Sequence, residues 1–238
     1  MTLSAVSLRG VAKTFSSGTE ALAPTDLDIA DGSFVAIVGP SGCGKSTLLR
    51  MIAGLAEATA GEVQRGDGAV GFVFQSPTLM PWATARENCA LPLALTGSGS
   101  DAGDALARVG LAGFEGAYPH ELSGGMQMRV SIARAMVTRP RLLLMDEPFA
   151  ALDELTRFKL NDDLLTLWKQ NRWTVVFVTH SIREAVFLAE RVVVLSPRPG
   201  RIVADIAVAL PDRAPGARLS HAFTDQCARV SAALEGAA

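Results

Sequence analysis

The segment that decides the fold of this chain reads Gly39-Pro40-Ser41-Gly42-Cys43-Gly44-Lys45-Ser46-Thr47. It matches the pattern G-x-x-x-x-G-K-[ST], in which backbone N–H groups turn inward around phosphate oxygens. An apolar run at residues 34–38 precedes it, and a helical pattern follows at residues 46–55. The N-terminus of that helix adds positive charge to the loop. The segment therefore predicts a nucleotide phosphate site, in which Lys45 reaches the β- and γ-phosphates and the Ser46 hydroxyl binds Mg²⁺.

A second segment, residues 142–147, is an apolar strand that ends in two carboxylates, Asp146 and Glu147. At the C-terminal edge of a parallel sheet, such residues face the crevice in which ligands bind. Asp146 can hold Mg²⁺ through water, and Glu147 can polarise an attacking water. Alone, the pair is also compatible with a solvated acidic turn. Together with the phosphate loop, we expect it to form the second half of one site.

Short apolar runs alternate with stretches of helical periodicity along the chain. We expect buried strands at residues 34–38, 71–74, 142–145, 175–178 and 191–195. We expect a loop at residues 96–100, and helices at residues 46–55, 83–95, 101–109, 123–138 and 154–170. Residues 3–29 alternate apolar and polar side chains around a Ser-Ser-Gly turn, which indicates half-buried strands. This alternation of strands and helices favours an α/β fold with a mostly parallel sheet.

Composition narrows the classes of function. The chain has 238 residues, of which 49% are hydrophobic and 19% charged, with a formal net charge of −2. This excludes a disordered chain, and the balanced charge gives no basic field for nucleic acid, so we expect no nucleic-acid partner. No apolar run reaches the ~18 residues of a membrane span, and we expect a protein kept in the cytosol. The three cysteines lie far apart, which argues against a disulfide framework or a zinc site.

A third segment, Leu122-Ser123-Gly124-Gly125-Met126-Gln127, precedes the acidic pair. Alone, it could be a helix-capping serine followed by two glycines. In its place between the phosphate loop and the acidic pair, it resembles the signature of ATP-binding-cassette (ABC) ATPases. The resemblance covers residues 3–210 and implies a P-loop NTPase fold with an antiparallel β subdomain. It implies an ABC ATPase domain over residues 1–210, a helical subdomain within it at about residues 76–140, and a tail over residues 211–238 that forms one short helix.

The resemblance assigns roles to single residues. Phe15 matches the position that stacks on adenine, where family members more often have Tyr. Gln75 matches the residue that joins the magnesium site to the helical insertion, and Asp153 matches the loop that crosses the dimer interface. His180 matches the switch histidine that contacts the γ-phosphate. Taken singly, Phe15, Gln75 and His180 are more readily explained by ordinary packing, and only their order along the chain favours the functional roles.

The resemblance also implies a mechanism. Such ATPases work as head-to-tail dimers, and we expect a homodimer that holds each ATP between the phosphate loop of one chain and the signature of the other. Ser123 and the N–H groups of Gly124 and Gly125, at a helix N-terminus, form the second half of the anion site. Water attacks the γ-phosphate, with Glu147 as general base and His180 maintaining the geometry. The expected enzyme is an ATPase that requires ATP and Mg²⁺.

Residues 76–82 contain an apolar cluster, Leu79, Met80 and Trp82. In the family this stretch lines the groove that receives a cytoplasmic helix of the membrane subunit; the alternative is a buried corner of the helical insertion. The cluster and residues 196–202 look like the nitrate/sulfonate/taurine branch of bacterial importers. This implies a peripheral protein on the cytoplasmic face of the inner membrane. It binds a permease directly and depends indirectly on a solute-binding protein outside the membrane.

Two other classes of protein remain as alternatives. A soluble ABC ATPase that remodels protein or nucleic-acid complexes would share all these motifs. Such proteins usually carry two cassettes or a long coiled-coil insertion, whereas this chain has one cassette and only residues 76–122 between Gln75 and Ser123. A small-molecule kinase would share the phosphate loop, but it does not explain the signature or His180. The sequence does not name the transported solute.

Overall fold

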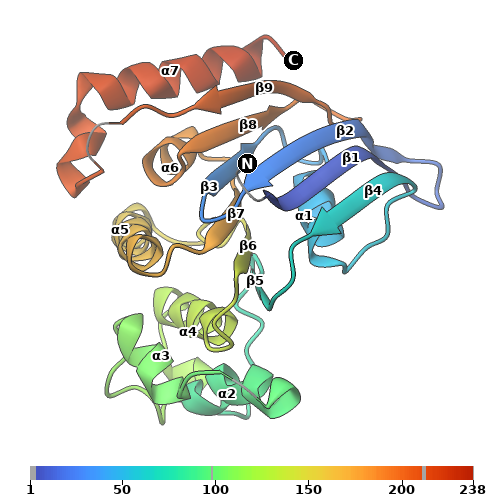
Figure 1. Cartoon of the computed structure of the whole chain (residues 1–238). Helices are drawn as coiled ribbons and strands as arrows, with labels where there is room; N and C mark the ends of the chain where they lie inside the picture. Colours follow the sequence, from blue (N-terminus) through green and yellow to red (C-terminus); the bar gives the residue numbers. More distant parts are fainter. Residues whose placement is uncertain (1–3, 98, 211–212, 238) are drawn as a thin grey trace. The chain divides into compact units, whose positions relative to one another are not determined.

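The computed structural model describes residues 4–97, 99–210 and 213–237 (Figure 1). Its internal contacts divide the chain into two units, one formed by Met1–Asp67 with Arg172–Ala238 and the other by Gly68–Asn171. Some expectations fall partly on residues outside the described ranges: Leu3 in the first strand pair, Ser98 in the loop at residues 96–100, and Pro211 at the start of the tail.

The first unit contains an antiparallel sheet in the order β2-β1-β4, formed by Glu20–Ala30, Ser4–Thr14 and Ala60–Arg65 (Figure 1). The expected alternation is present in β2, where Thr25, Leu27 and Ile29 are buried and the residues between them are exposed. Strand β4 approaches β1 closely at Gly61, where a Cβ would lie 2.3 Å from the Gly10 carbonyl oxygen. The sheet therefore needs a glycine at this crossing.

A second set of strands in the first unit has the order β7-β3-β8-β9. Strand β3 (Phe34–Val38) pairs in parallel with β7 (Thr174–Val178) and β8 (Arg191–Leu195), and β9 (Ile202–Ala207) pairs antiparallel with β8. Every residue of β3 and β7 is buried. Helices α1 (Lys45–Ala53) and α6 (Ile182–Leu188) contact these strands. Strands covered on both faces explain why their sequences are apolar without alternation.

The tail forms helix α7 (His221–Glu235), which at 15 residues is longer than the short helix expected from the sequence. It contacts α6, β8 and β9. Two arginines lie over aromatic rings at this contact, with Arg218 3.5 Å from the centre of the Phe187 ring and Arg183 5.0 Å from that of Phe223. Arg213 donates to the carbonyl oxygens of Leu188 and Ala189, at 3.3 and 2.8 Å. Burial lowers the pKa of Arg213. These contacts fix the tail helix against α6.

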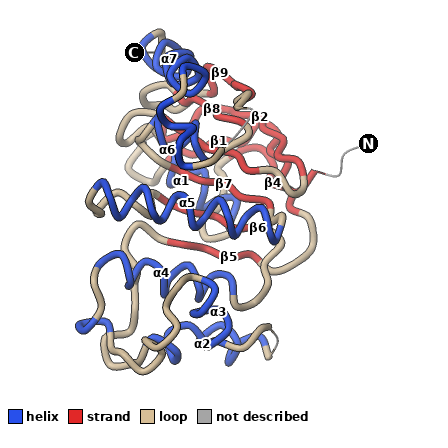
Figure 2. The backbone as a smooth tube through the Cα atoms, turned by 90° about the vertical axis from the view of Figure 1, so that its left-hand side faces the viewer, coloured by secondary structure: helices blue, strands red, loops and turns tan. Residues whose placement is uncertain are grey.

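In its described residues, the second unit contains a parallel pair of strands, β5 (Val70–Val73) and β6 (Leu142–Asp146), four α-helices and the short 3-10 helix Pro119–Glu121. The α-helices are α2 (Ala85–Thr96), α3 (Ala102–Arg108), α4 (Gly124–Met136) and α5 (Glu154–Asn171). Figure 2 shows α4 between β5 and the pair α2 and α3, in agreement with its contacts to all three. The predicted helical insertion at about residues 76–140 lies within this unit.

The helix starts in the second unit follow capping chemistry that the sequence carries. Thr84 and Glu87 form a reciprocal capping box at α2, with the Glu87 carboxylate 2.7 Å from the Thr84 backbone nitrogen. Asp101 caps α3 by accepting bonds from two backbone N–H groups. Each cap satisfies N–H groups that the first helical turn leaves without a partner inside the helix.

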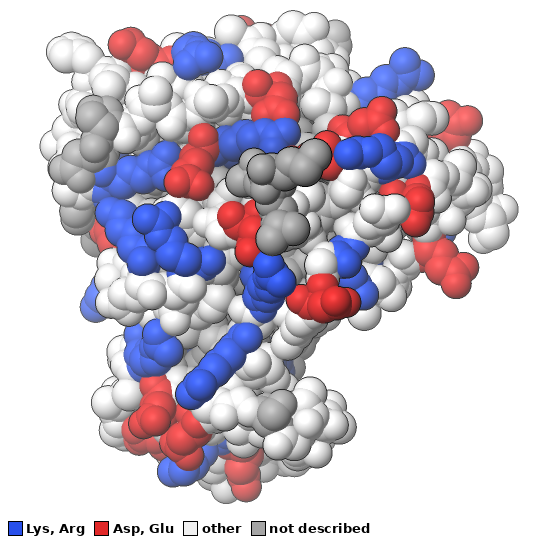
Figure 3. Space-filling model, in the orientation of Figure 1, with Lys and Arg blue, Asp and Glu red and all other residues white. Residues whose placement is uncertain are grey.

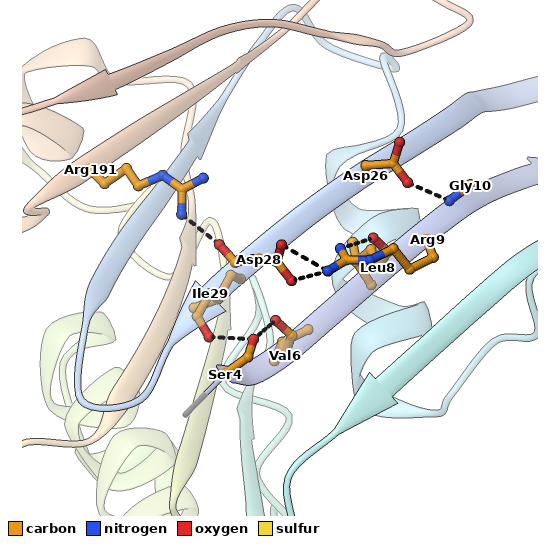
Figure 4. Close-up of polar contacts among 9 residues, drawn as sticks. All are labelled: Ser4, Val6, Leu8, Arg9, Gly10, Asp26, Asp28, Ile29 and Arg191. Atoms are coloured by element: carbon orange, nitrogen blue, oxygen red, sulfur yellow. Dashed lines mark hydrogen bonds and ion pairs between the residues drawn. The ribbon is translucent and has the colours of Figure 1, made fainter. Parts of the chain in front are cut away.

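A polar network joins β1, β2 and β8 in the first unit (Figure 4). Arg9 donates to both carboxylate oxygens of Asp28, at 2.8 and 2.9 Å. Arg191, on β8, donates to the backbone carbonyl of Asp28 at 2.5 Å, and it also pairs with the carboxylate of Asp205 on β9. Hydrogen bonding to Asp205 raises the pKa of Arg191. One arginine thus connects β2 of the antiparallel sheet to β8 and β9.

The surface carries charges of both signs. On the face drawn in Figure 3, acidic and basic side chains are interspersed. Within the ranges that the structure describes, no helix has the length and apolar character needed to cross a bilayer.

Replacing Arg191 with Ala removes two links between secondary-structure elements at once. We expect Arg191→Ala to lower the free energy of unfolding by about 1 kcal/mol, the range for lost hydrogen bonds of a partly exposed charge. Arg9→Ala is the matched control, because its ion pair with Asp28 is more exposed, at 53% and 57%. The free energies of unfolding of both variants are measured by urea titration, with circular dichroism as the readout. Equal losses in the two variants would contradict the connecting role of Arg191.

Candidate functional site

The predicted phosphate loop lies between β3 and α1, as the sequence indicated. Gly42 and Gly44 have φ angles of 75° and 103°, in the left-handed region that favours glycine. A Cβ on Gly44 would lie 2.6 Å from the Ala21 carbonyl oxygen, and one on Gly39 would lie 2.9 Å from that of Leu195. Backbone with alternating hand forms concave arrays of N–H groups that bind anions. The glycines are therefore required both for the shape of the loop and for its close packing.

Lys45 lies within the curve of this loop. Its side chain is 4% exposed, and its ammonium group donates to the carbonyl oxygens of Gly39 at 2.8 Å and Pro40 at 3.0 Å. Cys43 is buried at 1% exposure, which limits access of solution reagents to its thiol. A concave loop with one positive charge at its centre fits the phosphate groups of a nucleotide.

Two more predicted residues lie in the first unit. Phe15, in the turn between β1 and β2, is 44% exposed, and the Lys13 ammonium lies 5.6 Å from the centre of its ring. An exposed aromatic face is what stacking on a base requires. His180 is exposed and lies two residues after the end of β7. The residues on either side fix this turn, since the Thr179 hydroxyl donates to the Glu184 carboxylate at 2.5 Å and the Ser181 N–H donates to the Thr179 hydroxyl at 3.0 Å.

In the second unit, the structure places Gln75 and the acidic pair at one edge of the β5–β6 pair. The two strands are parallel, and Val73 lies opposite Met145, so Gln75 and Asp146 both follow at the carboxyl ends. Asp146 is 5% exposed. Glu147 has a φ angle of 45°, which costs about 1 kcal/mol for a residue with a side chain. A turn held in such a conformation is typical of functional sites.

The signature residues and Asp153 also lie close together in the second unit. Ser123 caps α4 by accepting a bond from the Met126 N–H at 3.3 Å. A Cβ on Gly125 would lie 2.7 Å from the Thr156 methyl group, in the first turn of α5. Asp153 accepts a bond from the Thr156 N–H at 3.0 Å, and its hydrogen bonds to Thr156 lower the pKa of Asp153. The N-termini of α4 and α5 are therefore neighbours, each with a positive dipole end.

The predicted magnesium ligands are all oxygen donors: the Ser46 hydroxyl, the Gln75 amide and the Asp146 carboxylate. In the described part of the chain, no three His, Cys, Asp or Glu side chains cluster to hold a metal. Mg²⁺ prefers hard oxygen ligands and is bound by few protein groups together with water and phosphate. The donor set fits Mg²⁺ and does not fit zinc.

Sequence reasoning missed one residue at the phosphate loop. Arg198, in the turn between β8 and β9, donates through Nε to the carbonyl oxygen of Gly42 at 3.1 Å. Arg198 lies within residues 196–202, a stretch that resembles one branch of a family but for which the sequence predicted no role at the phosphate loop. No local pattern relates residues 156 positions apart.

Comparison with known proteins gives consistent results. The sequence model of a family described as ABC transporter matches residues 22–150. An aliphatic sulfonates import ATP-binding protein, SsuB, of Bacillus cereus is 42% identical over 232 residues, which cover 92% of each chain. An uncharacterized ABC transporter ATP-binding protein of Methanocaldococcus jannaschii is 50% identical over 195 residues, 77% of this chain and 73% of the relative.

A solved structure of an ATP-binding cassette is similar to this chain in fold as well as in sequence. It is described as the dimeric, post-hydrolysis state of the ATP-binding cassette MJ0796 bound to ADP and Pi. It superposes with a TM-score of 0.75 at 36% identity, covering 86% of this chain and 99% of that chain.

Gly44→Ala tests the packing of the phosphate loop. The added methyl group meets backbone at 2.6 Å, so we expect loss of measurable ATP binding and a destabilisation of about 2 kcal/mol. Gly18→Ala is the control, because Gly18 also has a positive φ but no atom within 4 Å of its Cβ position. Titration with a fluorescent ATP analogue measures nucleotide binding by the two variants, and thermal melting measures their stability. A Gly44→Ala protein that binds like the control would contradict the assigned loop.

Proposed function

This chain belongs to the ATP-binding-cassette (ABC) transporter family, and on that premise we propose that it is the ATP-hydrolysing subunit of a bacterial importer. Two copies dimerise around ATP, and the dimer drives a membrane permease. The observation that carries the proposal is the ordered loop at residues 39–47, with its glycine cradle and buried lysine. The Bacillus cereus relative is named for the import of aliphatic sulfonates. Together with the sequence resemblance to the nitrate/sulfonate/taurine branch, this supports a small solute of that group as the cargo.

We propose that the chain's own residues divide the work of binding. Phe15 stacks on the base, and Lys45 exchanges its bonds to loop carbonyls for bonds to phosphate oxygens. Ser46, Asp146 and Gln75 would hold Mg²⁺. When bound, the metal neutralises charge on the phosphate oxygens. Of the other loop residues, Gly39, Ser41, Gly42, Gly44 and Thr47 bind phosphate through backbone N–H groups. Pro40 contributes through the fixed shape of its backbone, and Cys43 exchanges its N–H bond to the Pro40 carbonyl for one to phosphate.

Hydrolysis needs a base for the attacking water, and we assign that role to Glu147. Its carboxylate accepts the water proton while His180 hydrogen-bonds the γ-phosphate and keeps it in line. The partner copy contributes Ser123 and the N–H groups of Gly124 and Gly125, where the N-terminus of α4 supplies positive potential. Asp153 lies next to this signature through the α5 contact, which suits a loop at the dimer interface.

The proposed permease contact is the apolar cluster of Leu79, Met80 and Trp82. Trp82 is 76% exposed, whereas Leu79 and Met80 are half-buried. The buried Asn88 holds this loop by accepting from the Met80 N–H at 2.7 Å and donating to the Met80 carbonyl at 3.1 Å. A rigid loop with an exposed indole has the character of an anchor in a protein interface.

An apolar groove in the same unit extends this surface. Its volume is about 460 Å³, and its lining includes Phe72, Phe74, Thr78, Leu91 and Leu95. Leu95 is 81% exposed. Arg134 fixes the groove wall by donating to the carbonyl oxygens of Pro77 at 2.8 Å and Thr78 at 2.9 Å. We propose that a short amphipathic helix of the permease lies here, with its apolar side chains against the groove.

Glu147→Gln keeps the shape of the side chain but removes the base. We expect ATP hydrolysis to fall by about 10²- to 10⁴-fold, while ATP binding persists and dimers accumulate. Glu62→Gln, on the exposed strand β4, is the control for loss of one carboxylate. Phosphate release and size-exclusion chromatography with ATP measure both effects. Normal turnover in Glu147→Gln would remove Glu147 from its role, and phosphorylated product in place of free phosphate would indicate a kinase.

Trp82→Ala combined with Leu95→Ala tests the permease contact. We expect the wild-type chain to co-purify from detergent-solubilised native membranes with a multi-span permease, and the double variant to lose it while retaining ATP hydrolysis. Leu219→Ala is the control, because Leu219 is 91% exposed and lies in the first unit. If the double variant loses both ATP hydrolysis and binding of the permease, Trp82 and Leu95 have a structural role. If only soluble factors co-purify with the wild type, the remodelling ATPase replaces the importer.

A further inference from the structure

The turn between β8 and β9 contacts the phosphate loop at two successive residues. Arg198 Nε donates to the Gly42 carbonyl oxygen at 3.1 Å, and a Cβ on Gly42 would lie 3.1 Å from an outer nitrogen of the same guanidinium. Gly200 lies against the next residue, since a Cβ there would be 2.1 Å from the Cys43 carbonyl oxygen. The guanidinium therefore lies over Gly42, and the backbone of the turn lies against Cys43.

The turn that carries Arg198 is itself fixed by hydrogen bonds. The Ser196 N–H donates to the Arg201 carbonyl at 2.9 Å, and the Arg201 N–H donates to the Ser196 hydroxyl at 3.1 Å. Gly200 pairs with the start of β2, donating to the Ala21 carbonyl at 3.1 Å and accepting from the Ala23 N–H at 3.0 Å. Ala21 is also the residue whose carbonyl lies against Gly44. Arg198 thus projects from a rigid base beside the loop.

The bond to Gly42 determines the orientation of one peptide group. The Gly42 carbonyl and the Cys43 N–H share a peptide plane and point in opposite directions. The Cys43 N–H donates across the loop to the Pro40 carbonyl at 3.3 Å, while the carbonyl faces Arg198. Glycine backbone has many accessible conformations, so a residue at φ 75° needs an outside contact to keep this plane fixed. A charged donor provides a stronger contact than a neutral one.

We propose that Arg198 is a positioning residue of the nucleotide site. Its charge-assisted bond to the Gly42 carbonyl holds the phosphate loop in its binding shape, and its positive charge favours the phosphate groups of either ATP or ADP. The inference rests on the proposed function, because it assumes that residues 39–47 bind a nucleotide. It adds a residue of the β8–β9 turn to the contacts that shape the phosphate loop.

Arg201 offers a matched control within the same turn. It is also exposed and also an arginine, but it takes part in the turn through its backbone N–H and carbonyl. Arg198→Ala and Arg201→Ala remove the same charge from the same turn. Any difference between the two variants therefore measures the contact with Gly42 beyond the general effect of charge.

The experiment uses the full chain and measures affinity for fluorescent analogues of ATP and ADP together with steady-state hydrolysis. We expect Arg198→Ala to raise the Kd of both nucleotides about five- to tenfold, the lower range for a partly exposed charge-assisted bond. KM should rise by a similar factor, while kcat changes less than about twofold, because Arg198 touches no reacting atom. Arg198→Lys, which keeps a charged donor, should recover most of the affinity. Arg201→Ala should stay within about twofold of the wild type.

The outcomes separate this inference from the proposed function. If the wild type binds no nucleotide, the proposed function fails and the role of Arg198 fails with it. If the wild type binds and hydrolyses ATP, but Arg198→Ala and Arg201→Ala are alike, only the inference is overturned. Melting temperatures without nucleotide check folding. If Arg198→Ala melts at a lower temperature than the wild type, the Kd of Arg198→Gln decides. A Kd between those of the wild type and Arg198→Ala supports the charged contact, and a Kd equal to that of the wild type overturns it.

Discussion

The close approach of backbone to backbone at the phosphate loop is the constraint on which the rest of the first unit depends. Gly44 lies against the Ala21 carbonyl at the start of β2, Gly39 against the Leu195 carbonyl at the end of β8, and Gly200 against the Cys43 carbonyl. None of these contacts leaves space for a Cβ. The loop is therefore the point at which β2, β3, β8 and the β8–β9 turn meet, and the shape that suits phosphate is also the shape that assembles the unit.

The second unit meets a different requirement, which is to fix charges and helix dipoles at the ends of rigid elements. Asp146 ends the fully buried strand β6, and Glu147 directly after it keeps a left-handed backbone because the surrounding structure imposes it. The signature begins a helix in which Gly125 packs against Thr156 of α5, so the N–H groups of this first turn have little freedom to turn away. Local strain and close helix packing both serve to fix polar groups before a ligand arrives.

Strands that the sequence predicted well are those whose burial is complete. Residues 34–38 and 191–195 coincide with β3 and β8, because an apolar run bounded by turn residues admits few other interpretations. Strands β4 and β9 were missed: β4 is almost entirely exposed, and β9 buries no residue fully. Helix caps at Ser123, Thr84 and Asp101 follow from local chemistry. Contacts such as Arg198 with Gly42 depend on tertiary structure and have no local signal.

The bonds of Lys45 explain why positioning of the loop matters for affinity. Its ammonium group already donates to the carbonyl oxygens of Gly39 and Pro40, so binding a phosphate exchanges those bonds for others and gains less than a new bond would. The remaining affinity must come from N–H groups that already point inward, since any reorientation on binding would cost conformational entropy. A loop of small residues cannot supply that order alone. It follows that neighbouring segments, among them the turn that carries Arg198, contribute to nucleotide affinity without touching the nucleotide.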